Sequence, residues 1–95
     1  MAYGWKITRE YRDGCPRDCA PIYGPSGIKD DPRQRLDAGQ GLRFRMHDDD
    51  GNLMASGKFI PDDHTTQFEP LDDYGEANYG CTYITYWEGG RWAEL

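Results

Sequence analysis

The stretch Gly41–Ile60, GLRFRMHDDDGNLMASGKFI, predicts two β-strands joined by a tight turn. In its first part, apolar side chains alternate with basic ones, the period of two that is typical of a strand with one buried face. The two sets are Leu42, Phe44 and Met46 on one side, and Arg43, Arg45 and His47 on the other. The second strand covers Leu53–Ile60, where Gly57 indicates a bulge or a close approach of a neighbouring backbone.

The acidic residues between these two strands could form a calcium loop or a hairpin turn. Asp48, Asp50 and Asn52 have the alternate spacing of calcium ligands, but an EF-hand loop has glycine at its sixth position and glutamate at its twelfth. Counting from Asp48, Gly51 is the fourth residue and Phe59 the twelfth. Because aspartate, asparagine and glycine tolerate the positive φ of a tight turn, we predict a hairpin turn.

Two more segments have the pattern of strands. YGWKITREY at Tyr3–Tyr11 alternates, and CTYITYWE at Cys81–Glu88 is rich in aromatic and β-branched residues. Gly89 and Gly90 then predict a second tight hairpin before the terminal RWAEL. The predicted fold class is mainly β: a small antiparallel sheet of about five strands, able to curl into a partial barrel, with long irregular loops and little helix.

The remaining sequence is irregular. Residues 12–40 contain four prolines and four glycines, which predicts a long Pro/Gly-rich loop with a short helical turn at Pro32–Asp37. Pro61–Gly80 forms a second long connection. A loop of this length in a compact domain is usually functional or mobile. With 95 residues, the chain is expected to form a single domain, 1–95.

The composition bounds the core and the compartment. The chain is 37% hydrophobic and 14% aromatic and contains no valine, so large rings must supply most of the core. Neither a membrane-spanning apolar run nor a signal-peptide core is present, and the three cysteines are an odd number. These features favour a cytoplasmic protein without a complete disulfide framework.

Charge is unevenly distributed along the chain, whose net charge is −6. Residues 1–45 carry nine Lys or Arg and six Asp or Glu, a net +3, whereas residues 46–95 carry two and eleven, a net −9. An acidic surface of this kind disfavours direct nucleic-acid binding and favours a basic protein surface as the partner; the alternative is a surface that only aids solubility. The predicted binding residues are three groups of acids and two tyrosine anchors: Asp48, Asp49, Asp50, Asp62, Asp63, Asp72, Asp73, Tyr74 and Tyr79.

The cysteines leave three alternatives open. Cys15, Cys19 and Cys81 could form a zinc site with His47 or His64, which would make the chain a small zinc- or thiol-stabilised structural module. They could also be free thiols, with Cys81 as a buried strand residue. A disulfide between Cys15 and Cys19 within the loop is the third alternative. We favour free thiols and predict no cofactor.

No catalytic motif accompanies the two histidines, each of which stands beside aspartates. Phosphate-binding glycine loops and the H-E-x-x-H zinc motif are both absent, so we expect no enzymatic activity. Four arginines form a basic group with Phe44 interleaved: Arg33, Arg35, Arg43 and Arg45. Such a group could bind nucleic acid, but we expect these arginines to pair with aspartates of the same chain.

Three segments carry a resemblance: YGWKIT, FRMHDDDGNLMASGKF and FEPLDDYGEANYGCTYITYWEGGRWAEL. The chain resembles small bacterial and bacteriophage proteins without assigned function, outside the proline-rich loop. This resemblance implies a phage, prophage or bacterial origin. By analogy of size and charge, it suggests a small acidic protein-binding module that inhibits a host protein acting on nucleic acid, of the anti-CRISPR or anti-restriction type.

Overall fold

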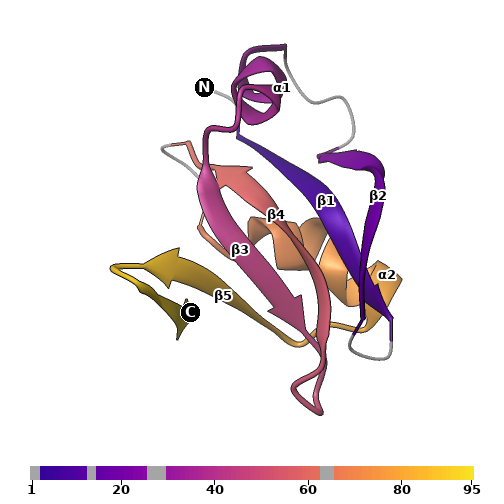
Figure 1. The fold of residues 1–95 in the computed structure, drawn as a ribbon. Coiled ribbons are helices and arrows are strands. Elements are labelled where there is room, and N and C mark those ends of the chain that lie inside the picture. Colours follow the sequence, from indigo (N-terminus) through magenta and orange to yellow (C-terminus); the bar gives the residue numbers. More distant parts are fainter. Residues whose placement is uncertain (1–2, 13–14, 26–29, 63–65) are drawn as a thin grey trace.

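The computed structural model describes residues 3–12, 15–25, 30–62 and 66–95. Within these residues the chain forms one open antiparallel sheet of six strands, in the order β2-β1-β4-β3-β5-β6 (Figure 1). The strands are β1 (Gly4–Arg12), β2 (Cys15–Gly24), β3 (Leu42–His47), β4 (Leu53–Ile60), β5 (Tyr83–Glu88) and β6 (Arg91–Glu94). The prediction of a mainly β fold is confirmed. The sheet stays open and does not close into a partial barrel.

Both predicted hairpins are present. β3 pairs with β4, with Phe44 opposite Gly57, and the turn between them contains Gly51 at φ +82°. β5 pairs with β6 through Gly89 and Gly90, whose φ angles are +56° and +91°. Positive φ at both central residues matches the right-handed twist of the paired strands, which explains why glycines occupy this turn.

The prediction of an irregular loop over residues 12–40 is wrong, because this segment contains β2 and the helix α1 (Asp30–Asp37). β2 forms the edge of the sheet and pairs with β1. Pro16 and Pro21 fit in this strand because a residue on a sheet edge can lack an N–H that would otherwise face a neighbouring strand. The helical turn predicted at Pro32–Asp37 is confirmed by α1, which lies against β1 and β4.

Within its described residues 66–82, the connection from β4 to β5 contains a helical segment. A π-helical turn, η1 (Leu71–Gly75), continues directly into α2 (Glu76–Tyr79), and Gly80 ends the segment at φ +66°. This helical segment crosses behind the sheet, whereas α1 lies at one end of it (Figure 1). In the described parts of the chain, no helix has the length and apolar character needed to cross a membrane.

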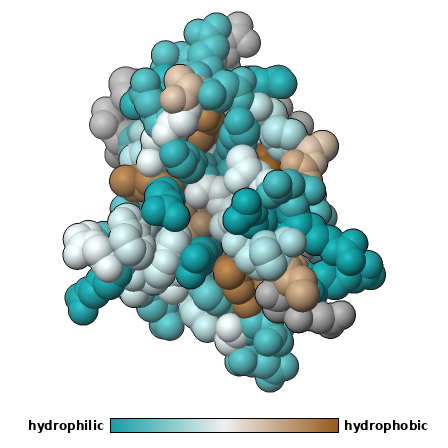
Figure 2. All heavy atoms as spheres, viewed as in Figure 1, coloured by the Kyte–Doolittle hydropathy of each residue, from teal (hydrophilic) through white to brown (hydrophobic). Residues whose placement is uncertain are grey.

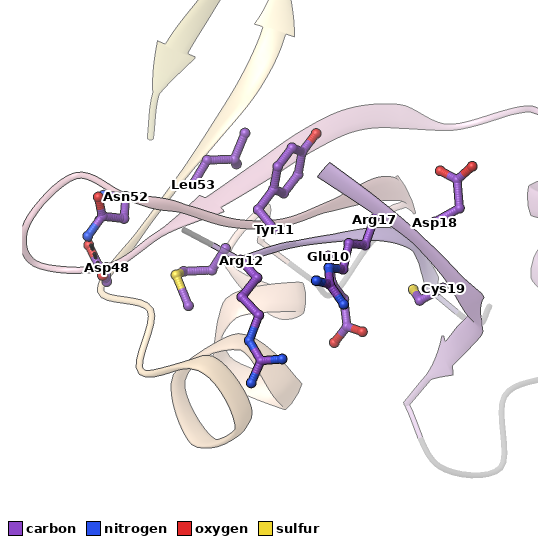
Figure 3. Close-up of a pocket in the computed structure, with 10 residues that line it drawn as sticks. Glu10, Tyr11, Arg12, Arg17, Asp18, Cys19, Asp48, Asn52 and Leu53 are labelled. Carbon is purple, nitrogen blue, oxygen red and sulfur yellow. Dashed lines mark hydrogen bonds between the residues drawn. The ribbon is translucent and has the colours of Figure 1, made fainter. Parts of the chain in front are cut away.

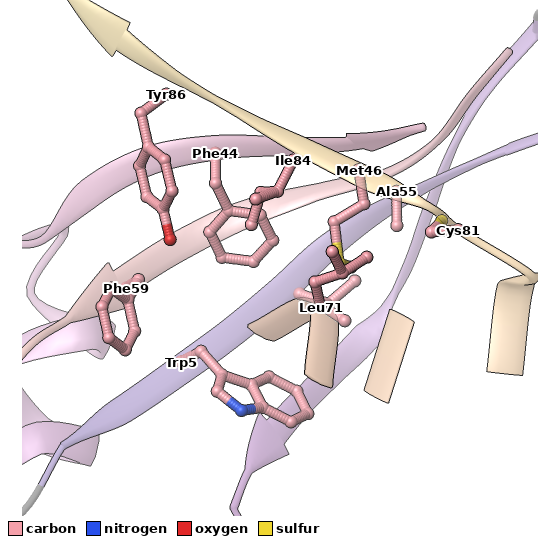
Figure 4. Close-up of a cluster of buried hydrophobic side chains, with 10 residues drawn as sticks. Trp5, Phe44, Met46, Ala55, Phe59, Leu71, Cys81, Ile84 and Tyr86 are labelled. Atoms are coloured by element: carbon pink, nitrogen blue, oxygen red, sulfur yellow. The ribbon is translucent and has the colours of Figure 1, made fainter. Parts of the chain in front are cut away.

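The hydrophobic core lies between the sheet and the η1–α2 segment (Figure 4). Four of the ten buried residues described in this cluster are aromatic, and of these Phe44, Phe59 and Tyr86 are almost completely buried. Gly75 brings the helical segment close to β3, since a Cβ at this position would lie 2.4 Å from Sδ of Met46. The helical layer therefore covers one face of the sheet and leaves most of the other face open.

Candidate functional site

The Asp48–Asn52 segment forms the predicted hairpin turn. The backbone N–H groups of Asp50 and Asn52 donate to Oδ1 of Asp48 over 3.0 and 2.8 Å, and the Asn52 side-chain amide donates to Oδ2 over 3.1 Å. These hydrogen bonds lower the pKa of Asp48 below its ordinary value. The Asp48 carboxylate therefore organises the turn, while Asp49 and Asp50 are exposed.

The predicted acidic groups do not form one surface. Asp48–Asp50 precede β4 and Asp62 follows it, so a strand on the order of 25 Å long separates them. Asp73 lies near the Asp62 end of the sheet, where it accepts hydrogen bonds from the Tyr3 hydroxyl at 2.9 Å and the Trp5 indole N–H at 3.0 Å. Asp72 is exposed, and Asp63 lies outside the described residues.

The two tyrosines predicted as anchors pack within the domain. Tyr74 contacts the Trp5 ring at a centroid distance of 5.3 Å and the Tyr79 ring at 5.6 Å. The Tyr79 hydroxyl donates to Glu10 over 2.7 Å, and burial together with this carboxylate raises the pKa of Tyr79. Both rings are half-buried against the core and hold the helical segment on the sheet.

The predicted metal ligands are not brought together. Cys15 and Cys19 lie four residues apart in β2, about 13 Å along an extended strand, which is too far for a disulfide. Cys81 is buried in the core, where desolvation raises its pKa to about 11. Among the described side chains, no group of three or more His, Cys, Asp or Glu could hold a metal ion. His64 lies outside the described residues.

His47 lies on the open face of the sheet, where its ring stacks on Tyr83 at a centroid distance of 4.7 Å. Nε2 is 3.2 Å from the Thr85 hydroxyl, whereas the buried Nδ1 has no hydrogen-bond partner in the described structure. Burial lowers the pKa of His47, and the positive charge of Arg45 acts in the same direction. The imidazole is therefore held in its neutral form.

A groove of about 550 Å³ on the open face gathers most of the basic side chains of the sheet. We call it the basic groove, and define it by Lys6, Arg9, Arg43, Arg45, Lys58 and Trp92. Since side chains alternate between the faces of a strand, burial of Phe44 and Met46 in the core places Arg43 and Arg45 on the opposite face. Figure 2 views the molecule as in Figure 1, with the open face of the sheet towards the reader, and shows mainly hydrophilic and neutral residues on this face.

The strand register places three of these cations side by side. Lys58 of β4 is paired with Lys6 of β1 on one side and with Arg43 of β3 on the other. Directly opposite side chains on neighbouring strands have Cβ atoms about 5 Å apart, and like charges in this arrangement destabilise a sheet. This row is therefore unfavourable for folding on electrostatic grounds.

Two of the five groove cations have carboxylate partners. Lys6 pairs with Asp37 and Arg9 with Asp18, each over 3.0 Å. Arg43, Arg45 and Lys58 form no ion pair with the carboxylates of the described residues.

Aromatic rings take the place of acids beside the two arginines. Arg43 lies 5.4 Å from the Trp87 ring and 5.5 Å from the Trp92 ring, and Arg45 lies 4.1 Å from Trp92. Arg33 similarly lies over Tyr23. The prediction that the four arginines pair with aspartates of the chain is not met in the described structure. Arg35 instead donates to the Gln40 side chain.

A second groove, of about 670 Å³, lies between the paired strands β1 and β2 and the Asp48–Asn52 turn (Figure 3). Glu10 and Arg12 project towards the helical side of the sheet, and Tyr11 and Asp18 project the opposite way. Burial raises the pKa of Cys19, so its thiol is protonated at neutral pH and is a poor nucleophile. This groove mixes both signs of charge, which gives it no preference for anions over cations.

The sequence contains a signal for the basic groove, namely the alternation of arginine with apolar residues over Leu42–His47. The lysines and Trp92 lie on other strands, and only the strand order brings them to the same place. Comparison with protein-family models, curated proteins and solved structures finds no match to this chain. The functional argument therefore depends on the geometry of the groove.

Proposed function

We propose that this chain is a non-enzymatic binding module that holds an anionic macromolecule in the basic groove. The observation that carries the proposal is the row Lys6–Lys58–Arg43, in which Asp37 offsets the charge of Lys6 but Lys58 and Arg43 face each other as like charges without a carboxylate partner among the described residues. An anionic partner would turn this unfavourable arrangement into a favourable one. Surfaces adapted to binding commonly retain such destabilising features.

The net charge of −6 does not oppose this partner, because most acidic residues of the described chain lie outside the groove; Asp18 and Asp37, which line it, are each paired with a groove cation. The basic residues of the groove lie on the open face, whereas Glu69, Asp72, Asp73 and Glu76 belong to the helical segment and the residues just before it. Exposed charges further apart than a Debye length, about 8–10 Å at physiological salt, interact weakly. The local field over the groove therefore governs the encounter with a ligand.

The test measures binding of fluorescent inorganic polyphosphate to the whole chain by anisotropy. Each arginine–phosphate contact contributes about 0.7 to the slope of log affinity against log salt, a contribution that is lost at about 1 M salt. At 0.1 M salt, one decade lower, Arg43→Gln/Arg45→Gln should therefore remove about 1.4 log units of affinity, or about 25-fold. The control Arg17→Gln/Arg91→Gln removes the same charge from exposed positions outside the groove. Equal effects of the two double variants would contradict the proposal.

The helical side supports a second candidate, the basic protein partner expected from the sequence. Phe68 is 40% exposed beside the acids of the helical segment, and an exposed ring with surrounding acids is a suitable contact for a basic surface. Proteins captured from a bacterial lysate at low salt should be lost with Asp72→Asn/Glu76→Gln and kept with Asp49→Asn/Asp50→Asn. A capture that does not depend on the position of the acids argues against this candidate.

A further inference from the structure

Trp87 and Trp92 form an aromatic pair at one end of the basic groove, in which Trp87 is exposed and Trp92 is half-buried. They are cross-strand partners in the β5–β6 hairpin, and their rings meet edge to face at a centroid distance of 5.4 Å. Trp87 is 42% exposed, whereas Trp5 is buried in the core. The open pair therefore contributes little to the core, and rigid exposed rings of this kind are common in binding surfaces.

The two arginines connect these rings to the row of lysines. Arg43 contacts both rings and Arg45 contacts Trp92, so the side chains are held in place while their charge remains available to a ligand. Arg43 is also the strand partner of Lys58. A path across β4, β3 and β5 therefore runs from cations that can bind phosphates to rings that can bind bases.

We propose that the ligand of the basic groove is single-stranded nucleic acid, with phosphates bound by Lys58, Arg43 and Arg45 and a base stacked on Trp87. This inference rests on the proposed binding of an anion in the groove. Sheets that bind single strands combine these same two components, since every base has a flat face and every nucleotide a negative charge.

Two other anionic ligands fit the groove less well. In duplex DNA the bases are stacked inside the double helix, so that no base is free to stack on Trp87. An acidic peptide would neutralise the cations, but its carboxylates have no ring to stack on Trp87.

The experiment compares probes of matched charge: a labelled oligothymidylate of about 15 nucleotides, inorganic polyphosphate and polyglutamate. Trp87→Ala should weaken binding of the oligothymidylate about 5- to 150-fold, the range for loss of one stacked base, and polyphosphate binding less than twofold. Trp87→Leu keeps an apolar contact with Trp92 and should show the same selective loss. The control Phe68→Ala removes an aromatic side chain of similar exposure on the helical side.

Salt dependence gives a second measurement. With three phosphate contacts, the slope of log K against log salt should be about −2, and Arg43→Gln should reduce its magnitude by about 0.7. If polyphosphate binds and Trp87→Ala weakens all probes equally, the groove binds anions but the nucleic-acid inference is wrong. Tighter binding of polyglutamate than of the oligothymidylate also overturns it. If no polyanion binds, the proposed function itself fails.

Discussion

Gly57→Ala is expected to destabilise the domain strongly, because Gly57 lies where β1 and β4 approach most closely. A Cβ at this position would lie 1.9 Å from the carbonyl oxygen of Lys6 and 2.8 Å from its carbonyl carbon. These atoms belong to the backbone of a neighbouring strand, so no side chain can turn away to relieve the clash. Reaching an ordinary contact of 3.4 Å requires β1 and β4 to separate by about 1.5 Å.

The expected cost follows from that separation. Two ladder hydrogen bonds would be weakened or lost, at about 0.5–1.5 kcal/mol each, and the backbone shift beside buried Ile7 adds about 1–3 kcal/mol. Replacing glycine with alanine also lowers the conformational entropy of the unfolded chain, which offsets about 0.4–1 kcal/mol of this loss in stability. The free energy of unfolding should therefore fall by about 3 kcal/mol, a large part of the ~5–15 kcal/mol typical of a domain.

Urea denaturation and thermal unfolding measure this loss, which corresponds to a decrease in Tm of about 12–24 °C for a domain of this size. The control is Gly89→Ala, at a hairpin position with φ +56° and nothing within 4 Å of the added Cβ. There we expect only the cost of a left-handed backbone, about 1–2 kcal/mol. If Gly57→Ala is as stable as the wild type, the close approach of β1 and β4 is incorrect.

Three further predictions concern single contacts. Asp73→Ala leaves the part-buried Trp5 indole N–H without its acceptor and should cost about 1–2 kcal/mol in urea denaturation, whereas Asp73→Asn keeps an acceptor and should cost less. The lowered pKa of His47 predicts a contribution to the free energy of unfolding that is fully present above pH ~6.5 and is lost as the pH falls towards the pKa of the folded state. His47→Gln should reduce this loss in thermal melts between pH 7.5 and 5. An unchanged pH profile of Tm would contradict the prediction. Lys58→Gln should make the free energy of unfolding less dependent on salt between 0.01 and 1 M, because it removes the central charge of the row; an equal salt dependence in both proteins would count against like-charge repulsion.

Most of the sheet could be predicted because its strands alternate and its turns contain glycine. β2 could not, because a sheet edge tolerates Pro16 and Pro21 and buries few of its residues, so neither composition nor periodicity indicates a strand. The helical segment lacks a clear sequence signal for a related reason. Gly75 lowers helix propensity, yet the fold needs it there to leave room for Met46.

The candidate site is harder to predict, because the net charge of a sequence segment does not show which charges the sheet brings together. The net charge of −9 over residues 46–95 adds together the charges of the hairpin turn, the helical segment and Lys58, which lie in different parts of the fold. Tyr74 stands beside acidic residues, as tyrosines in binding surfaces often do, but its ring packs on Trp5 within the domain. A small domain needs the large apolar area of its aromatic rings for its own packing. The strand order, which determines which charges become neighbours, cannot be read from the net charge of a sequence segment.

The architecture also supports the proposed binding in the basic groove. Strand β3, which carries both Arg43 and Arg45, buries Phe44 and Met46 on its other face, so the core fixes the backbone that presents these two cations. A surface built on packed strands loses less conformational entropy on binding than one built on loops. Substitutions in the groove should therefore alter affinity without disturbing the core, whereas substitutions such as Gly57→Ala should act through the fold. If the anion binds elsewhere on the protein, substitutions in the groove would leave the affinity unchanged.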